Sequence, residues 1–528
     1  MSVVLSRMID DLAGLLKGEL RIDPLTRAMY ATDASLYQML PYGVLIPKDR
    51  DDVLTVVKYC DEMKIPLVPR GAGTGVAGSA IGNGLVIDFS RSMREIVSIG
   101  EETVTVQPGV VYERLNQRLR EEGRYFPPDP SGNWTTTLGS MLAVDGAGSH
   151  SGRVGSTRDH VLTLDLVMAN GNFLRAMLEP LSYPPGTDSG VPSFKRDLVS
   201  KLAQLLLLHA DLIQKYQPGT LVRNRLGYYL RGVLSESHLN LPRMLVGSEG
   251  TLGIITEATL HTAPLPPNRV AMILLFGQLE SATKAVHLLQ PLLPSACDLL
   301  DRRLLTLARE SDPNYENLIP ASAEAALIVE TDGFSPEQAA ARLSDMLRAV
   351  RSGVETQFVV HEVHDAGDVD FLWTLPRRVV PLLTSLQGPT RALPFVEDVA
   401  IPPESLHELL VNAQRIFRKH RVITSLYAHA AAGQIHFRPF MESPMPETAM
   451  KMEELARDLY EVVYSLGGTI GGEHASGLSR SGFIEDQYGP LYGVFRQIKE
   501  IFDPYNLMNP GKVISDDPHL ILKNLRPP

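Results

Sequence analysis

The sequence predicts an α+β protein with more than one folded domain, and three observations support this. The chain has 528 residues, 44% hydrophobic and 21% charged, which is typical of roughly two to four globular domains. Short apolar strands alternate with short helices over the first 268 residues. From about Val270, after the proline-rich linker 263–268, longer apolar strands alternate with amphipathic helices.

The elements of the first part follow in order along the chain. Residues 1–40 are predicted to be helical, and a strand follows at 44–46. A helix is expected from about Asp51 to Met63, with Asp49 or Asp51 at its N-cap. Further short strands bounded by turn residues are predicted at 66–69, 85–89, 95–99 and 103–106.

Charge and cysteine content exclude several classes of protein. Lys and Arg number 50 against 61 Asp and Glu, a net charge of -11, and there is no basic run. Nucleic acids and anionic membranes bind concentrated positive charge, so neither is expected as a partner. The two cysteines, Cys60 and Cys297, lie far apart. They exclude a disulfide framework and an iron–sulfur cluster held by this chain alone, and they favour a reducing compartment.

Targeting and membrane segments are not expected. The N-terminus is amphipathic and acidic, without the basic flank, apolar run and cleavage site of a signal peptide. The richest apolar run, 202–213, falls short of the ~18 apolar residues that a membrane span requires. We therefore expect a cytoplasmic protein without a transmembrane segment. A peripheral position at the inner face of a membrane is the alternative.

A glycine-rich stretch follows the strand at 66–69. Its segment GTGVAG, residues 73–78, matches GxGxxG, but the nicotinamide-binding form of that motif must open a helix. The next strand begins at Leu85, which leaves no room for one. Two interpretations remain: a loop whose backbone N–H groups bind an anion, and a plain surface loop.

An ordered series of motifs resembles a known family. PRGAGTGVAGSAIGNGLVIDFS, VTVQPGV, YFPPDPS, GAGSHSGRVGSTRDHV and VGSEGTLGIITEATL occur in this order. The series resembles the FAD-binding domain of the vanillyl-alcohol-oxidase/p-cresol-methylhydroxylase superfamily. Within it, the chain is similar from about residue 35 to 515 to D-2-hydroxyacid dehydrogenases, which act on D-lactate, D-2-hydroxyglutarate or glycolate. The resemblance implies a two-part FAD-binding domain with an inserted α+β cap domain of antiparallel sheet and helices.

The resemblance implies contacts with FAD along the chain. The first glycine loop would close on the pyrophosphate, since glycines remove Cβ atoms from the approach. Segments 128–130 and 146–149 would border the isoalloxazine, and 250–255 the adenine half. No histidine lies in the first loop, so noncovalent FAD is expected. The residues expected to bind the cofactor are Pro69, Arg70, Gly71, Ala72, Gly73, Thr74, Gly75, Gly78, Pro128, Asp129, Pro130, Gly146, Ala147, Gly148, Ser149, Gly250, Gly253, Ile255 and Asn509.

Three histidines and a glutamate lie in Gly/Ala-rich settings. His429 and His436 occupy a predicted strand–turn–strand, and Glu473 and His474 follow a glycine-rich approach. Two imidazoles and a carboxylate suit a divalent metal with open positions for substrate; histidines buried for structural reasons are the alternative. The relatives' patterns, GHxGDGNxH and EHGxG, imply that His429, His436 and Glu473 bind zinc, manganese or iron. They imply that His474 is the catalytic base.

These roles imply oxidation of a D-2-hydroxy acid to the 2-oxo acid. The metal lowers the pKa of the substrate hydroxyl, His474 removes its proton, and a hydride passes to flavin N5. Arg391 falls where relatives carry a cation for the substrate carboxylate; from the residue alone, an exposed ion-paired arginine is equally open. Relatives carry an arginine three residues after a tryptophan, in the pattern WxxR. Here Pro376 stands at that position, so Arg377, one residue later, is the second candidate for binding the substrate.

Several positions depart from the family pattern. Gln434 replaces an asparagine, two alanines, Ala431 and Ala432, replace a Gly-Asp pair, and Ala475 replaces a glycine. These changes alter the groups that would face the substrate. The alternative function is therefore a flavin-binding, catalytically degenerate paralogue that acts as a partner or electron-transfer subunit. A metallohydrolase using the two histidines and the glutamate is a more remote alternative.

The end of the chain bears on electron transfer. Many relatives continue past the NPGK signature, here 509–512, into a cysteine-rich iron–sulfur region, whereas this chain ends soon afterwards. The expected electron acceptor is a quinone, a flavoprotein or an iron–sulfur subunit, and the oligomeric state is left open. The expected division is an N-terminal FAD-binding part at 1–268, a cap or substrate domain at 269–459, a C-terminal part completing the FAD domain at 460–515, and a tail at 516–528.

Overall fold

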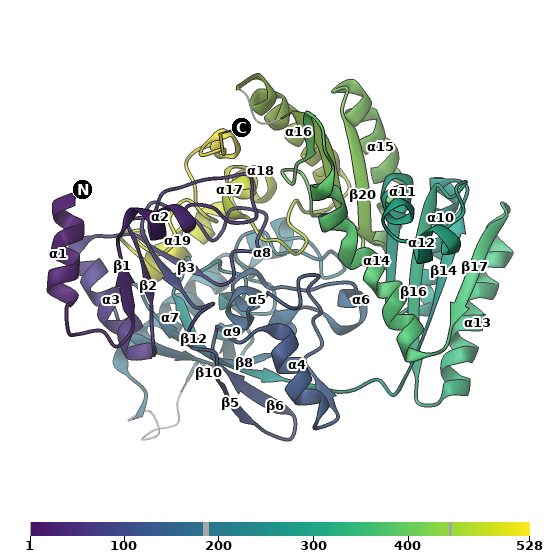
Figure 1. The fold of residues 1–528 in the computed structure, drawn as a ribbon. Coiled ribbons are helices and arrows are strands. Elements are labelled where there is room, and N and C mark those ends of the chain that lie inside the picture. The colour runs from purple at the N-terminus through teal and green to yellow at the C-terminus, as the bar shows by residue number, and fades with distance from the viewer. Residues whose placement is uncertain (1, 183–189, 443–445, 528) are drawn as a thin grey trace.

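The computed structural model describes residues 2–182, 190–442 and 446–527, and these form two parts (Figure 1). The base contains the N-terminal half of the chain together with the returning C-terminal helices. The cap is the large sheet and its covering helices at the right of the view. In the described ranges, no helix combines the length and the apolar character needed to cross a bilayer.

The base contains a mixed four-stranded sheet that begins the fold. Its strands, in spatial order, are β1 (Glu19–Arg21), β2 (Gly43–Ile46), β4 (Leu85–Asp88) and β3 (Leu67–Arg70). The pairs β2–β4 and β4–β3 are parallel. Helix α3 (Arg50–Met63) connects β2 to β3, and the Asp49 side chain caps it by accepting from two backbone N–H groups. The predicted helix and strands are confirmed here to within one or two residues.

One expectation for this region is wrong. Residues 1–40 were predicted to be helical, but only α1 (Ser2–Leu12) and α2 (Pro24–Met29) form, with β1 between them. Leu20 pairs with Leu45 of β2, so this segment is drawn into the sheet as an edge strand. Tertiary pairing overrides the local preference there.

A second sheet and two ribbons complete the base. The five-stranded antiparallel sheet has the order β5 (Ile96–Ile99), β6 (Thr103–Val106), β12 (Ile254–His261), β8 (Val161–Val167), β9 (Phe173–Ala176). The ribbons pair β10 (Leu178–Pro180) with β11 (His238–Asn240), and β7 (Arg124–Tyr125) with β13 (Ala263–Pro264). The other helices before the cap are α4 (Tyr112–Arg120), α5 (Leu138–Val144), α6 (Ser151–Val154), α7 (Ser193–Leu208), α8 (Ala210–Tyr216) and α9 (Leu241–Leu245).

The cap is an antiparallel sheet covered by helices, as expected. Its strands run β17 (Phe358–Val363), β14 (Asn268–Phe276), β16 (Ala325–Gly333), β15 (Ala296–Asp301), β20 (Ile423–His429), β21 (Gln434–Glu442) and β18 (Thr390–Ala392), and β19 (Val399–Ala400) also pairs with β21. The covering helices are α10 (Leu279–Leu289), α11 (Arg302–Ser311), α12 (Pro313–Leu318), α13 (Pro336–Gly353), α14 (Ala366–Ser385), α15 (Leu406–Lys419) and α16 (Pro446–Ser465).

Alternation along β14 explains the two layers of helices. Met272 and Leu274 join the core that includes α10 and α13, whereas Ile273 and Leu275 join the core that includes α11 and α14. Successive side chains of a strand point to opposite faces, so a strand buried on both faces reads as one continuous apolar run. The apolar texture after residue 268 has this origin.

The chain then returns to the base through α17 (Gly477–Arg480), α18 (Ile484–Tyr488) and α19 (Leu491–Phe502). Leu67 of β3 forms a bridge with Met508, so the C-terminal segment rejoins the first sheet. The base is therefore discontinuous in sequence. The boundary predicted at 459/460 falls inside α16, and a division that keeps this helix intact lies after Ser465.

Polar side chains just before α6 join the base to the cap. Ser149 Oγ donates to Asp298 at 2.7 Å. His150 bridges the two parts, with Nδ1 2.6 Å from Asp129 Oδ2 of the base and Nε2 3.3 Å from Glu330 Oε1 of the cap. Burial by itself would lower the pKa of His150, but the carboxylates of Asp129 and Glu330 outweigh it and raise this pKa to about 10.

The His150 bridge predicts a pH-dependent contribution to stability. Because its pKa is raised in the folded protein, the contribution is fully present below about 6.5, the ordinary histidine value, and is lost as pH rises through about 10. His150→Gln should therefore lower Tm at pH 6, and its difference from wild type should shrink towards pH 10. The exposed His361→Gln on β17 is the control. A difference that stays constant with pH would contradict the bridge.

Candidate active site

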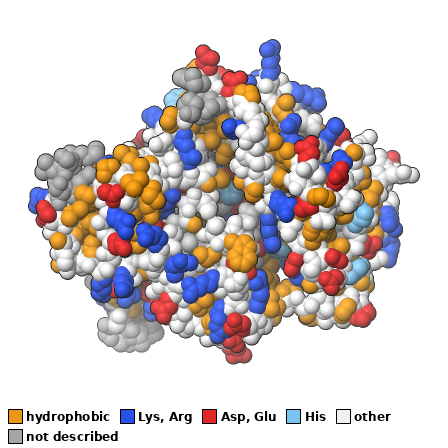
Figure 2. Space-filling model, viewed as in Figure 1, with side chains coloured by type: hydrophobic (Ala, Val, Ile, Leu, Met, Phe, Trp, Pro, Cys, Tyr) orange, Lys and Arg blue, Asp and Glu red, His pale blue; other side chains and the backbone are white. Residues whose placement is uncertain are grey.

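One cavity of the base collects most of the residues expected to bind the cofactor. Figure 2 shows a hollow in the surface between the two parts of the molecule, and histidine side chains are visible inside it. Glu473 and His474 line the same cavity as the glycine loop. The expected cofactor residues that line it are Pro69, Arg70, Gly71, Gly73, Thr74, Gly75, Pro130, Gly146, Ala147, Gly250, Gly253 and Ile255.

Other expected cofactor residues do not line the cavity. Ala72, Gly78, Pro128, Asp129, Gly148, Ser149 and Asn509 are not among the residues that line the cavity. The Asn509 amide donates to the backbone oxygens of Ser79 and Glu249 at 2.9 and 2.7 Å, so it supports the wall. A Cβ on Gly148 would lie 1.9 Å from the backbone oxygen of Asp129, so this glycine permits close packing of two wall segments.

Part of the lining was missed by the sequence reasoning. These residues are Ser79, Ala80, Phe89, Pro108, Ser131, Gly132, Thr136, Thr137, Gly139, Ser140, Met141, Ala143, Val144 and Glu249. The small residues of TTTLGS at 135–140 were the available signal, because small side chains at the start of α5 let the backbone reach the cavity. Thr137 caps this helix by accepting from the backbone N–H of Ser140.

Glu249 ties the glycine loop to the segment that carries His474. Its carboxylate accepts from the Ser79 hydroxyl at 2.7 Å and from the backbone N–H groups of Ser476 and Gly477 at 2.7 and 2.8 Å. Glu249 is buried and has a φ of 55°, which is uncommon outside glycine. The loop and the histidine segment therefore have a fixed relative position.

The predicted histidine cluster forms on the strand–turn–strand of the cap. His429 ends β20 and His436 lies on β21. The Nε2 atoms of His429 and His436 lie 3.4 and 3.2 Å from Glu473 Oε1. Ligand atoms of these three residues lie within 4.8 Å of one another. The geometry thus assembles one metal-ligand atom from each residue, from two segments far apart in sequence.

Carboxylates that the sequence reasoning missed hold these imidazoles from behind. Asp298 Oδ1 lies 3.0 Å from His429 Nδ1, and Glu397 Oε1 lies 2.8 Å from His474 Nδ1. Burial by itself would lower the pKa of His474, but Glu397 and the neighbouring carboxylates outweigh it and raise this pKa to about 9. Burial opposes ionisation of Glu397, yet His474 and Arg438 hold its pKa well below the usual range.

Asp398 fixes the backbone that presents Glu473 and His474. Its carboxylate accepts from the two backbone N–H groups, at 2.8 Å from Glu473 and 2.7 Å from His474. The Gln434 amide also donates to Asp398, at 3.3 Å. The glutamine that departs from the family pattern is therefore buried behind the segment that carries Glu473 and His474, on the side of Asp398.

The two arginines expected to hold the substrate are not brought to the cluster. Arg391 pairs with Met441, an odd number of residues from His436, so the two side chains lie on opposite faces of the sheet. Arg391 is exposed and donates to the Leu386 backbone oxygen. Arg377 is exposed on α14. The geometry gives neither residue support as a substrate ligand.

A different arginine lies beside the histidines. Arg438 is two residues from His436 on β21 and therefore shares its face. Its Nη2 lies 3.3 Å from Glu397 Oε2, and its side chain is 11% exposed. Arg480, which is fully buried, donates to the other oxygen of Glu397 at 2.9 Å. Arg438 is thus the arginine of the cluster that retains access to solvent.

Comparison with known proteins places this fold and cavity in a class. The model of the FAD binding domain matches residues 41–177, and that of the C-terminal domain of FAD linked oxidases matches residues 265–513. The structure resembles that of p-cresol methylhydroxylase, with a TM-score of 0.71, 14% identity and 97% of each chain covered. The fold is therefore that of p-cresol methylhydroxylase, and the matched domains are those of FAD-binding proteins. The C-terminal match is to the domain found in FAD linked oxidases.

Curated relatives point to hydroxy-acid oxidoreductases. D-2-hydroxyglutarate dehydrogenase of Pseudomonas putida is 31% identical over 94% of this chain and 50% of its own length. Glycolate oxidase subunit GlcD of Bacillus subtilis is 27% identical over 93% of each chain. The chain spans about half the length of the D-2-hydroxyglutarate dehydrogenases that it matches.

Close packing at Gly148 predicts a specific loss of cofactor. Gly148→Ala would push its Cβ against the Asp129 backbone and displace the wall that includes Pro130. The purified variant should therefore carry less FAD per chain than wild type, measured from the visible flavin absorbance and the protein concentration. Gly152→Ala is the matched control, because a Cβ there meets nothing within 4 Å. Full FAD content in Gly148→Ala would show that this wall tolerates displacement.

Proposed function

We propose that this chain is an FAD-dependent dehydrogenase that oxidises a D-2-hydroxy acid to the 2-oxo acid. The observation that carries the proposal is the position of Glu473 and His474, which line the cavity of the glycine loop and also belong to the histidine cluster. A substrate held at the cluster therefore lies against the cofactor cavity. Bound FAD would accept the substrate Cα hydrogen as a hydride.

The residues of the cluster fit a divalent metal. Glu473 Oε2 is buried and finds no hydrogen-bond partner among the described residues. The four carboxylates of the cluster, Asp298, Glu397, Asp398 and Glu473, outnumber its two arginines, Arg438 and Arg480. Without a metal the remaining negative charge is balanced by protons on the histidines, whose pKa values these carboxylates raise. Buried charges need compensation. A divalent ion on His429, His436 and Glu473, with zinc, manganese and iron as candidates, would balance the site and polarise the substrate hydroxyl.

His474 has the position of a general base. Its Nδ1 faces Glu397, and its side chain, 28% exposed, lines the cavity. Because Nδ1 is engaged with Glu397, Nε2 is the nitrogen that would accept the hydroxyl proton of the substrate when the ring is neutral, and the charge of a bound metal ion would favour that neutral form. Asp398 holds the backbone N–H of this residue, which limits movement of the ring relative to the cavity.

Arg438, rather than Arg391, would bind the substrate carboxylate. It lies on the His436 face of β21 and contacts Glu397 at 3.3 Å. A guanidinium carries five N–H donors, so donors remain for a substrate carboxylate. We propose that this carboxylate is bound jointly by Arg438 and the metal.

Cofactor attachment and electron transfer complete the proposal. FAD is bound noncovalently, which is supported by the absence of histidine from the glycine loop at 71–78. A flavin reduced in this site would need an electron acceptor, for which a quinone, a flavoprotein or an iron–sulfur partner is the candidate. A catalytically degenerate flavin protein is not favoured, because the base and the three metal-ligating side chains are assembled in one place.

The activity is tested by anaerobic reduction of the bound flavin. With metal supplied, D-2-hydroxyglutarate, D-lactate or glycolate should bleach the visible flavin band. His474→Ala should retain FAD and be reduced at least about 100-fold more slowly, the usual contribution of a general base. Loss of FAD from this variant would mean that His474 is structural. A wild-type flavin that no 2-hydroxy acid reduces would falsify the proposed activity.

The carboxylate contact predicts a change in substrate affinity. Arg438→Gln removes a charge-assisted hydrogen bond of about 1.5–3 kcal/mol, so KM for the reducing substrate should rise roughly tenfold or more. The measurement is the substrate dependence of flavin reduction. Arg391→Gln tests the position suggested by the sequence and should leave KM unchanged. The reverse pattern would move the carboxylate site to β18.

A further inference from the structure

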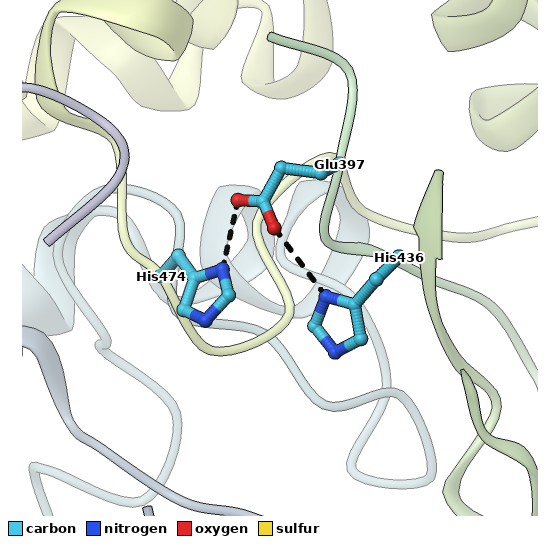
Figure 3. Close-up of side chains that lie close together, drawn as sticks. All are labelled: Glu397, His436 and His474. Carbon is cyan, nitrogen blue, oxygen red and sulfur yellow. Dashed lines mark hydrogen bonds and ion pairs between the residues drawn. The ribbon is translucent and has the colours of Figure 1, made fainter. Parts of the chain in front are cut away.

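Glu397 lies between two imidazoles with different proposed roles. It is completely buried, just before β19, and Figure 3 shows its two oxygens directed at His436 and His474. Oε1 lies 2.8 Å from His474 Nδ1, and Oε2 lies 3.5 Å from His436 Nδ1. His436 Nδ1 is buried and makes no hydrogen bond among the described residues, so Glu397 is the acceptor that it faces.

Each oxygen of Glu397 also has an arginine. Arg480 Nη2 lies 2.9 Å from Oε1, and Arg438 Nη2 lies 3.3 Å from Oε2. Two guanidinium groups, one fully buried, hold Glu397 as a carboxylate that can only accept hydrogen bonds. Both imidazoles must therefore present an N–H at Nδ1.

The opposite ring nitrogens face the reaction site. His436 Nε2 and His474 Nε2 lie 3.2 and 3.7 Å from Glu473 Oε1. A neutral imidazole carries one proton, so an N–H at Nδ1 leaves a lone pair at Nε2. That lone pair is what a metal ligand needs at His436 and what a base needs at His474.

We propose that Glu397 is a positioning residue that sets the tautomer of the metal ligand His436 and of the base His474 at the same time. This rests on the proposed function for the roles of the two imidazoles, but the tautomers themselves are independent of it. One buried carboxylate thereby couples metal affinity to base strength. Asp298, which faces His429, acts on a metal ligand alone.

A competing arrangement would make Glu397 a metal ligand. Glu397, His436 and His474 also bring ligand atoms within 4.8 Å of one another. Arg438 and Arg480 argue against it, because a cation on Glu397 would lie beside two guanidinium groups. Glu473 contacts three histidines and has a buried oxygen free of hydrogen bonds in the described chain, so it is the better ligand.

Wild-type protein gives the direct test. Long-range proton–nitrogen NMR of isotope-labelled histidine distinguishes an N–H at Nδ1 from one at Nε2, and His436→Asn and His474→Asn assign the two signals. The measurement is made on the metal-free FAD-loaded protein above pH 9, because the raised pKa of His474, about 9, leaves this ring doubly protonated at lower pH. Both rings should carry the proton at Nδ1. A neutral ring that carries its proton at Nε2 alone overturns the proposal, whatever the enzyme does with substrates.

Glu397→Gln then tests the coupling. A glutamine has one acceptor oxygen and one donor amide, so it can serve one of the two rings and opposes the other. Zinc affinity, measured by competition with a chromophoric chelator, should fall about 10–100-fold, or the pH profile of flavin reduction should shift, or both. Glu408→Gln, at an exposed carboxylate on α15 outside the cluster, is the matched control and should leave both zinc affinity and that profile unchanged. FAD content confirms folding in both variants.

The remaining outcomes separate the hypotheses. Glu397→Gln with wild-type zinc affinity and an unchanged pH profile overturns the coupling. Zinc retained in His429→Asn but lost in His474→Asn identifies Glu397 as a ligand and also overturns it. If no 2-hydroxy acid reduces the wild-type flavin, the proposed activity fails. The tautomers and the zinc affinities of the variants still decide the role of Glu397.

Discussion

The site depends on Asp398, whose carboxylate accepts hydrogen bonds from two backbone N–H groups. Asp398 belongs to the cap, and Glu473 and His474 lie on the segment that returns to the base. On the other side, Glu249 of the base accepts from the backbone N–H groups of Ser476 and Gly477. The returning segment is thus held from both parts within a few residues. Charge-assisted hydrogen bonds of this kind are among the stronger ones in proteins.

Charge compensation explains why the cluster is built as it is. Buried carboxylates stand behind each imidazole, Asp298 behind His429 and Glu397 behind His436 and His474. Unpaired, these groups would oppose folding, and the two arginines balance only part of their charge. A site with residual negative charge favours a divalent cation. The carboxylates that orient the imidazoles therefore also create the negative charge that would attract the proposed metal.

The sequence predicted local features well and long-range ones unevenly. The Asp49 cap, the strands of the base and the strand–turn–strand of His429 and His436 depend on neighbouring residues, so their patterns were readable. The sequence did not show on which face of the sheet Arg391 lies, because the face of a strand residue depends on pairing register, which places it opposite Met441. Glu397 was missed because it meets His474 only through the packing of cap on base.

The sequence by itself determined the α+β class, the glycine loop, the residues available for catalysis and the resemblance to FAD-linked dehydrogenases. These follow from composition, local spacing and motif order. Only the tertiary structure decided which of those residues share a cavity, which arginine reaches the histidines and which carboxylates orient them. The physical reason is that tautomer, charge balance and strand face are set by contacts between segments distant in sequence, from residue 249 to 477, and local pattern carries no record of such contacts.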